Sequence, residues 1–349
     1  MSTRRWADNP ILSPQDIRPL SDQTEVIGVF NAGVTRLGRD IVLLLRVAER
    51  VKNPDPNTHL AAVYDLARHQ ITAIAFDGQD PDCDVTDPRL ISLPTERYLT
   101  SVSTLRLARS RDGIHFTVDD RAGLFPQTPY ETFGLEDPRI TFIDGLWYID
   151  YVAVSPRGIA TALVSTTDFE RFQRHGLLFG PENRDVVLFP ERIGGRFLCL
   201  HRPTSPFSLK QEVWLADSPD IMSWGGHRFL FGPRPGFWDS VKLGPGAVPF
   251  RTEQGWVEVY HGVDDDNRYC LGAILLDKDE PWIVRARSKA PILEPTEAYE
   301  RRGFVGNVVF TCGLLFEEQR LKIYYGAADT TLCYAEIPIE DVFNGLEPV

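Results

Sequence analysis

A strand pattern that recurs along almost the whole chain is the strongest constraint on its fold. Each copy consists of short apolar runs separated by Gly, Pro, Asp and Asn, and these runs are typical of β-strands. In each copy, a first strand is followed by a turn with Gly and then by an aromatic-rich strand. A third strand ends in small residues, and a Ser/Thr-Asp-aromatic corner closes the copy. The copies cover residues 33–50 with 103–120, 139–154 with 158–179, 186–203 with 212–231, 246–263 with 269–293, and 307–337.

A four-stranded antiparallel sheet is too small to bury both faces alone, and stacking such sheets radially solves the problem. Five copies in 349 residues leave about 60–70 residues each, enough for four strands and their loops. We therefore predict an all-β fold, a single-domain five-bladed β-propeller over residues 31–340. Residues 1–30 would be an amino-terminal extension and 341–349 a tail, with short helices at 13–20 and 339–346. A β-sandwich or two smaller β domains is the alternative.

The net charge of −12 argues against nucleic acid or an anionic membrane as a partner, because both require clustered positive charge. The start of the chain has two arginines without a following apolar stretch, and no segment approaches the run of about 18 apolar residues that a membrane span needs. We expect a cytoplasmic protein. Five scattered cysteines without a C-x-x-C pair argue against a zinc site or a disulfide framework, and no metal or cofactor is implied.

Two adjacent carboxylates stand directly before a strong predicted strand, in residues 134–140. In a propeller, such acids point into the central funnel or onto its rim. Pro138 stiffens the backbone there, and Arg139 is suited to orient a neighbouring acid. Asp137 is the candidate general acid, with Glu136 beside it; a structural turn is an equally open interpretation at this point.

Basic residues recur at corresponding places in the next copies and would line one wall of the funnel, where they could clamp a phosphate. They are Arg184 with its neighbour Asn183, Arg202, Lys242 and His261. Each has an ordinary structural explanation, such as pairing of Arg202 with Glu191, or a hydrogen-bonded histidine at the end of a strand. Taken together, they favour an anion site.

The remaining candidates lie in the first copy, the fourth and the last. The first copy offers Asn31 and Arg46, and the last offers Asp329. Trp238, Tyr260 and Phe304 are candidate platforms for the apolar face of a sugar. The sequence contains no nucleophile elbow, P-loop, dinucleotide fingerprint or H-E-x-x-H motif.

Taken in order, these segments resemble glycoside hydrolase family 130, which contains β-mannoside phosphorylases and some β-mannosidases. The resemblance runs from about residue 31 to 335. It rests on GLEDPRIT, NRDVVLFPERIGGRFLCLHRP, WDSVKLGPG followed by GWVEVYHGV, and YYGAADT.

The resemblance implies a five-bladed propeller and an inverting, single-displacement reaction. Asp137 would be the general acid and would protonate the bridging oxygen through the 3-hydroxyl of the mannosyl unit. Inorganic phosphate would attack the anomeric carbon from the opposite face, so that a β-mannoside yields α-mannose 1-phosphate. No second catalytic carboxylate is then required, whereas inverting hydrolysis needs a base about 6.5–9.5 Å from the acid.

The resemblance also assigns binding residues. Arg202, Lys242 and His261 match the phosphate-binding residues of the phosphorylases, with Arg184 or Asn183 as a further contact. The mannosyl side would be contacted by residues in or beside the same motifs: Asn31, Arg46, Glu136, Arg139, Asp239, Tyr260 and Asp329.

Three alternatives remain open. An inverting β-mannosidase would need a base, for which Glu136, Glu191 or Asp239 are available, but the retained basic residues argue against it. Another five-bladed glycosidase family, with three acids on separate blades, is not expected to carry the LHRP and WDSVK segments. A non-catalytic sugar-binding propeller would have to keep the acid and the basic cluster desolvated for a neutral ligand, which is costly.

The acceptor is not readable from the sequence. Glucose, N-acetylglucosamine and mannose, through a β-1,4 or β-1,2 linkage, all fit the family. Residues 53–87 and 264–267 are the loops that we expect to choose among them, and a homo-oligomer is possible.

Overall fold

The computed structural model describes residues 3–205, 207–208 and 210–349 and is built almost wholly from β-strands. The helices in the described residues are short: a 3₁₀ turn at Pro14–Asp16, α1 (Ala298–Arg301) and α2 (Ile339–Asn344). None of them is long and apolar enough to span a membrane. The predicted all-β class is confirmed, and the first and last of these helices lie inside the two stretches where short helices were predicted.

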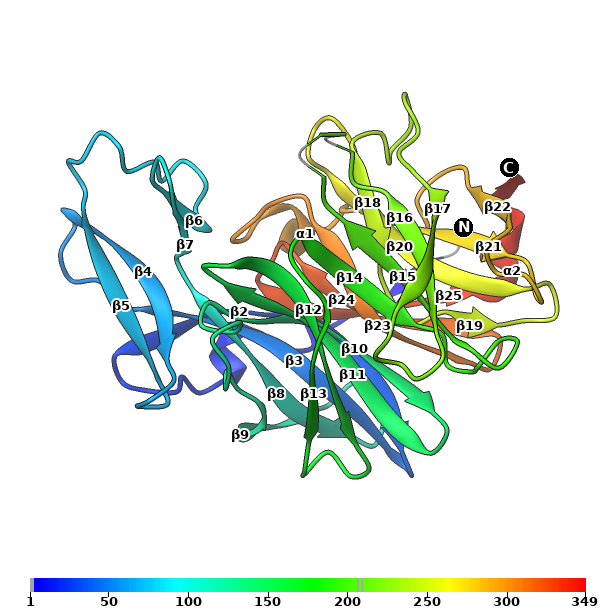
Figure 1. Cartoon of the computed structure of the whole chain (residues 1–349), viewed down its shortest axis with the longest axis horizontal. Helices are drawn as coiled ribbons and strands as arrows, with labels where there is room; N and C mark the ends of the chain where they lie inside the picture. The colour runs from blue at the N-terminus through cyan, green and yellow to red at the C-terminus, as the bar shows by residue number, and fades with distance from the viewer. Residues whose placement is uncertain (1–2, 206, 209) are drawn as a thin grey trace.

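Strand pairing divides the strands into antiparallel groups of four, which we call units one to five (Figure 1). Unit one contains β2 (Thr24–Leu37), β3 (Asp40–Val51), β8 (Val102–Ser110) and β9 (Thr117–Leu124). Unit two contains β10 (Gly134–Ile143), β11 (Leu146–Ser155), β12 (Gly158–Thr166) and β13 (Gln173–Phe179). Unit three contains β14 (Asn183–Leu188), β15 (Phe197–Pro203), β16 (Val213–Ser218) and β17 (Gly225–Phe231).

Units four and five carry the additions. Unit four contains β18 (Lys242–Pro245), β20 (Trp256–Val263), β21 (Tyr269–Leu276) and β22 (Val284–Ser288), extended by β19 (Phe250–Arg251) and β26 (Leu346–Pro348). Unit five contains β23 (Val309–Glu317), β24 (Arg320–Ala327), β25 (Thr331–Pro338) and β1 (Arg4–Arg5). A parallel bridge between β8 and β10 joins units one and two into one sheet.

The core lies between the units. Apolar clusters join unit one to two, two to three, three to four, four to five, and five back to one; representative pairs are Leu44 with Ile149, Leu163 with Cys199, Leu200 with Trp256, Val257 with Ile323, and Tyr324 with Val29. The first strands of units one to four lie next to one another in turn, and β2 also lies against β23 of unit five. Each unit therefore buries its two faces against two different neighbours.

Strands near both ends of the chain pair with the sheets, although the predicted division assigned residues 1–30 to an extension and 341–349 to a tail. β1 pairs with β25 and supplies the fourth strand of unit five, while β26 extends unit four. The predicted boundaries at residues 31 and 341 fall inside β2 and α2. The physical reason is that the last sheet has only three strands of its own, and its open edge is paired by the amino terminus.

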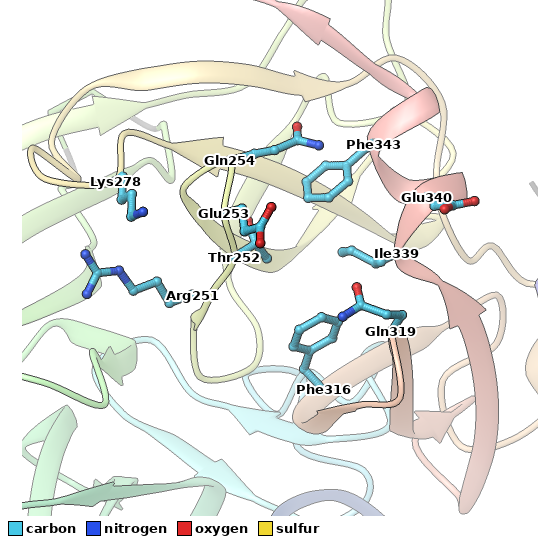
Figure 2. A pocket seen from close by; sticks show the side chains of 10 residues that line it. All are labelled: Arg251, Thr252, Glu253, Gln254, Lys278, Phe316, Gln319, Ile339, Glu340 and Phe343. Carbon is cyan, nitrogen blue, oxygen red and sulfur yellow. The ribbon is translucent and has the colours of Figure 1, made fainter.

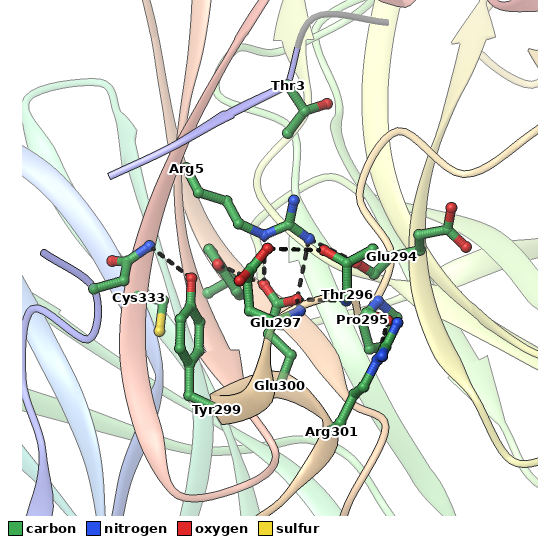
Figure 3. A network of polar contacts seen from close by, with 12 residues as sticks. Thr3, Arg5, Glu294, Pro295, Thr296, Glu297, Tyr299, Glu300, Arg301 and Cys333 are labelled. Carbon is green, nitrogen blue, oxygen red and sulfur yellow. Dashed lines mark hydrogen bonds and ion pairs between the residues drawn. The ribbon is translucent and has the colours of Figure 1, made fainter. Parts of the chain in front are cut away.

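A buried ion pair fixes this amino-terminal strand (Figure 3). The Nε of Arg5 lies 2.7 Å from Oε1 of Glu300, whose side chain is fully buried. The hydroxyl of Tyr325 donates to the same oxygen, and the backbone N–H of Thr296 donates to the other. Burial opposes ionisation of Glu300, but Arg5 and the backbone donors outweigh it and lower its pKa.

Between β3 and β8 the chain forms two extra hairpins, β4 (Thr58–Asp65) with β5 (Gln70–Asp77) and β6 (Leu90–Ser92) with β7 (Arg97–Leu99). Figure 1 shows β4 and β5 standing at one end of the long axis, apart from the five units. The stretch 53–87, predicted as a loop, is thus largely a regular hairpin. Its alternating pattern buries Ala62 and Tyr64 in a small cluster that also contains Val102 of β8.

Candidate active site

Three of the first strands carry the same local distortion. Asn31 on β2, Asp137 on β10 and Asp185 on β14 all have left-handed backbones, with φ of 48°, 48° and 55°. Each lies in a β-bulge, where the pairing with the next strand shifts register. Asn and Asp tolerate this conformation better than other residues with a side chain, and a bulge re-aims side chains at the end of a strand. The repeated bulge therefore presents one polar group from each of three neighbouring units.

The first group of side chains is centred on Asp137. Its Oδ1 accepts hydrogen bonds from Nδ2 of Asn31 at 2.9 Å and from a terminal nitrogen of Arg46 at 2.8 Å. The other terminal nitrogen of Arg46 donates to Oε1 of Glu136 at 2.7 Å, and its Nε donates to Ser103 at 3.1 Å. The guanidinium of Arg46 is thus shared between two carboxylates from the GLEDPRIT segment.

A third carboxyl, Asp329, completes this acid cluster from the turn after β24. Burial raises the pKa of Asp329 to about 6, against the attraction of Arg46. Burial likewise raises the pKa of Glu136. Burial also opposes ionisation of Asp137, but Arg46, Arg139 and the Asn31 hydrogen bond prevail and lower its pKa. Near neutral pH Asp137 is therefore ionised, whereas Asp329 takes up a proton as the pH falls through about 6.

The second group is centred on Asp185, whose side chain is 2% exposed. A terminal nitrogen of Arg202 lies 2.9 Å from Oδ2, and Nε2 of His261 lies 3.6 Å from the same oxygen. Arg139 approaches Oδ1 at 3.5 Å. Arg202 also donates to Gln211 at 2.6 Å. One carboxylate thus holds three nitrogen-bearing side chains from three units, β10, β15 and β20.

Two further cations complete this basic cluster. Arg184, half-buried on β14, acts electrostatically on both Asp185 and Arg202. The Nζ of Lys242 lies 4.8 Å from the centre of the Tyr269 ring. Burial lowers the pKa of His261 to about 3, so its imidazole is neutral. The cluster carries more positive charge than Asp185 can balance, and this excess favours an anionic ligand.

The structure does not bring Asp239 and Tyr260, which we predicted to contact substrate, to either group. Both side chains are fully buried, and the Tyr260 hydroxyl donates to Asp239 at 2.8 Å. Arg234 and Arg287 close the network around Asp239. Trp238 stacks on Tyr260 inside the same core, so it is not available as a sugar platform. Inward-facing positions of β20 and the tight turn before β18 explain this burial.

Arg139, also predicted to contact substrate, is fully buried, and its donors point at backbone carbonyls. Asn183 uses its amide nitrogen on Nδ1 of His201 at 3.0 Å. The suggested partner of Arg202 is also different, since Glu191 pairs at the surface with Arg251. Of the three candidate bases for hydrolysis, Glu136 alone therefore lies in the acid cluster.

Sequence reasoning missed the centre of the basic cluster. Asp185 follows Arg184 just as Asp137 follows Glu136, at the same place in consecutive copies. Aligning the copies on their first strands was the signal that could have found it. Tyr269, the ring beneath Lys242, carried no such signal, because it opens β21, the third strand of its unit.

A surface groove lies elsewhere. Its volume is ≈ 850 Å³, and none of the predicted site residues lines it; Figure 2 shows Arg251, Gln254, Lys278, Gln319 and Phe343 around it. Arg251 lies on β19 and Phe343 on α2, while Gln254, Lys278 and Gln319 lie between strands. Gln254 precedes β20 and His261 lies near its other end, so the two are about 20 Å apart at the rise of an extended strand. The described residues contain no cluster of three or more side chains arranged to hold a metal ion.

Comparison with models of known protein families assigns the chain to a family. Residues 95–347 match the model of glycoside hydrolase family 130, described as β-1,4-mannooligosaccharide phosphorylase. The chain belongs to glycoside hydrolase family 130. The resemblance noted in the sequence is thereby confirmed, and with it membership of an enzyme family.

Characterised members of family 130 are similar over much of their length. The β-1,2-mannobiose phosphorylase of Listeria innocua serovar 6a is 44% identical over 351 residues, covering 99% of both chains. The 1,2-β-oligomannan phosphorylase of a Thermoanaerobacter species is 37% identical over 252 residues, covering 71% of this chain and 83% of its own. The solved structure of the Listeria enzyme with β-1,2-mannobiose superposes with a TM-score of 0.96 over 99% of both chains.

Proposed function

We propose that this family 130 protein is an inverting phosphorylase that cleaves β-1,2-mannobiose and related β-mannosides with inorganic phosphate, releasing α-mannose 1-phosphate. The observation that carries the proposal is the meeting of the acid cluster around Asp137 with the basic cluster around Asp185. Both start from bulges in neighbouring first strands, and Arg139 contacts both, bonding the backbone of Asp137 and approaching the carboxylate of Asp185.

The scaffold that we propose is a five-bladed β-propeller. The five units and the apolar clusters that link each to the next, including the fifth to the first, support this arrangement. In a propeller the first strand of each blade lines the axis. The bulged residues of β2, β10 and β14 and the start of β18 would then surround one end of that axis.

The acid cluster suits the mannosyl side of the reaction. In our proposal Asp137 donates a proton toward the bridging oxygen, through the 3-hydroxyl of the mannosyl unit, while Asn31, Arg46 and Asp329 hold that sugar. Asp137 is ionised in the free protein, so it must take up a proton when the complex forms. A bound phosphate anion next to it would raise its pKa, because a like charge disfavours ionisation.

The basic cluster suits the nucleophile. Arg184, Arg202 and Lys242 supply charge-assisted donors, and neutral His261 supplies a donor or acceptor, depending on its tautomer. The reaction balances without a base: an HPO₄²⁻ oxygen bonds to the anomeric carbon, the carbon–oxygen bond to the acceptor breaks, and the proton of the phosphate replaces the one that Asp137 gave up. Water needs a base carboxylate to attack in the same way.

The β-1,2 linkage is proposed from the relatives. The Listeria β-1,2-mannobiose phosphorylase aligns over 99% of this chain, so it shares the hairpins inserted between β3 and β8, whereas the family model begins only at residue 95. The Thermoanaerobacter relative also bears the name of a β-1,2-specific enzyme.

The test is turnover of β-1,2- and β-1,4-mannobiose and of mannosyl-N-acetylglucosamine, with and without phosphate, followed by ³¹P and ¹H NMR. We expect phosphate-dependent formation of α-mannose 1-phosphate, fastest from β-1,2-mannobiose. Free mannose released at the same rate without phosphate would make the protein a hydrolase and contradict the proposal. A faster reaction with a β-1,4 substrate would contradict the linkage alone.

A further inference from the structure

The buried guanidinium of Arg139 sits between the acid cluster and the basic cluster without being part of either surface. Its Nε donates to the carbonyl of Gly246 at 3.0 Å, one terminal nitrogen donates to the carbonyl of Asp137 at 3.0 Å, and the other donates to the carbonyl of Pro245 at 3.1 Å. The last nitrogen also lies 3.5 Å from Oδ1 of Asp185. All three guanidinium nitrogens are therefore used internally.

These partners belong to three different units. Asp137 lies on β10, Asp185 on β14, and Pro245 with Gly246 at the end of β18, the strand that starts with Lys242. The first strands of these units are not paired with one another in a sheet. Arg139 thus provides fixed polar contacts across the strands that present the acid, the centre of the basic cluster and the lysine.

The backbone of β18 comes close to this centre because of two glycines. A side chain at Gly244 would come within 2.5 Å of Asp185 and 2.7 Å of His261, and one at Gly246 would come within 2.3 Å of the carbonyl of Val259. The Gly246 peptide is held from both sides, since its N–H donates to Glu258 at 2.9 Å. The position of Gly246 relative to Arg139 is therefore tightly defined.

The charge of Arg139 is kept although the side chain is buried. Burial opposes its positive charge, but nearby acidic groups, including Asp185 and Asp137, raise its pKa. The side chain also faces Asp150, Glu258 and Cys312. Asp137, whose left-handed backbone conformation would otherwise be costly, has its carbonyl fixed by this cation. A planar fork with donors in three directions is a geometry that lysine does not reproduce.

We propose that Arg139 is a positioning residue that fixes the distance and orientation between the acid Asp137 and the phosphate-binding side chains around Asp185. This inference rests on the proposed function, because it concerns the distance between the proton donor and the nucleophile. The role is exerted through the backbone of its own strand at Asp137 and of unit four at Pro245 and Gly246.

The test compares R139K with R106K. Arg106 is an equally buried arginine on β8 that binds Glu49 and lies outside both clusters, so it reports the general effect of losing a buried guanidinium. We expect R139K to lower kcat by about 100-fold, the size of effect that a misplacement of about 1 Å produces. We also expect it to raise the KM for phosphate at least about 10-fold, the loss expected for one weakened charge-assisted contact. R106K should lose stability in urea but keep both kinetic constants.

Failure of the proposed function and failure of the positioning role can be told apart. Turnover by the wild type tests the proposed function. The ratio of kcat between R139K and the wild type tests the positioning role, whether the wild type uses phosphate or water as the nucleophile. If R139K does not fold, R139A is titrated with guanidinium or, as a control, ammonium ions, and guanidinium alone should restore turnover. R139K kinetics equal to those of R106K, or no recovery of folded R139A, would overturn the proposal.

Discussion

At the scale of single residues, the acid cluster holds three carboxyls around one guanidinium in different protonation states. Asp137 receives direct hydrogen bonds from Arg46 and Asn31 and is held ionised, whereas burial governs Asp329 and raises its pKa to about 6. Environments that push neighbouring pKa values apart divide acid–base roles between like groups. The acid cluster therefore combines an ionised carboxylate, Asp137, with a carboxyl, Asp329, whose pKa is about 6.

The role of Asp137 leads to the first prediction. D137N should lower the rate of phosphorolysis by about 100- to 10,000-fold, the contribution typical of a general acid, while the fold is kept, because the amide retains the shape of the carboxyl. Steady-state kinetics and circular dichroism measure the two effects. D279N, at an exposed surface aspartate, is the control. Near-wild-type turnover in D137N would exclude Asp137 as the acid.

The second prediction concerns Asp329 and pH. Because its pKa is raised in the folded state, the unfolded chain ionises first, and stability falls as pH rises from about 4 to about 6. D329N removes this loss. We expect the gain of D329N over wild type in the free energy of unfolding to be about 1 kcal/mol larger at pH 7.5 than at pH 5, measured in urea.

Comparing the same pair of proteins at two pH values cancels any change in packing that the substitution causes. D279N again serves as control and should show no such difference, since its carboxylate is exposed. An equal gain of D329N at both pH values would mean that Asp329 has an ordinary pKa. Loss of turnover in D329N is expected in addition, because the residue faces the proposed mannosyl site.

At the scale of elements, the bulge in the first strand re-aims a polar side chain, and its repetition in neighbouring units gathers these side chains into a site. Three copies place Asn or Asp at the left-handed position, and the fifth unit has a register shift at the equivalent place in β23 without such a residue. The strand periodicity could be predicted from the sequence, because alternation is local. The pairing of β1 with β25 could not, since a two-residue strand carries no periodicity and its partner lies over 300 residues away.

The third prediction tests this amino-terminal strand. R5A leaves the carboxylate of Glu300 buried without its charge partner (Figure 3) and should lower the free energy of unfolding by about 3 kcal/mol. R50A removes an exposed pair with Glu25 and should cost less than about 1 kcal/mol. Urea denaturation followed by tryptophan fluorescence measures both. Similar small losses in the two variants would show that β1 is not needed to complete unit five.

At the scale of the whole molecule, a strongly acidic protein concentrates positive charge at one place. The net charge is −12, yet Arg139, Arg184, Arg202 and Lys242 converge around the single carboxylate of Asp185. Mutual repulsion among these groups lowers the stability of the ligand-free protein, and a bound oxyanion relieves it. If phosphate binds there as proposed, function and stability are coupled through it.

The fourth prediction follows from this coupling. Phosphate at about one hundred times its Kd should stabilise the wild type by about 2.7 kcal/mol, seen as a rise in Tm, while sodium chloride of equal ionic strength should not. K242A should lose most of the rise. K278A, at an exposed lysine beside the distant groove of Figure 2, should keep it. Equal shifts in K242A and K278A would place phosphate elsewhere.

The sequence by itself determined the all-β class, the repeated units, the family and the segments that bear the acid and the basic residues, because alternation and short motifs are encoded locally. Only the tertiary structure decided which of those residues meet. It separated Asp239 and Tyr260 into a buried network, made Asp185 the centre of the basic cluster, and turned Arg139 inward onto three carbonyls. The reason is that contacts between units depend on how sheets from distant parts of the chain are placed, and no local pattern records that placement.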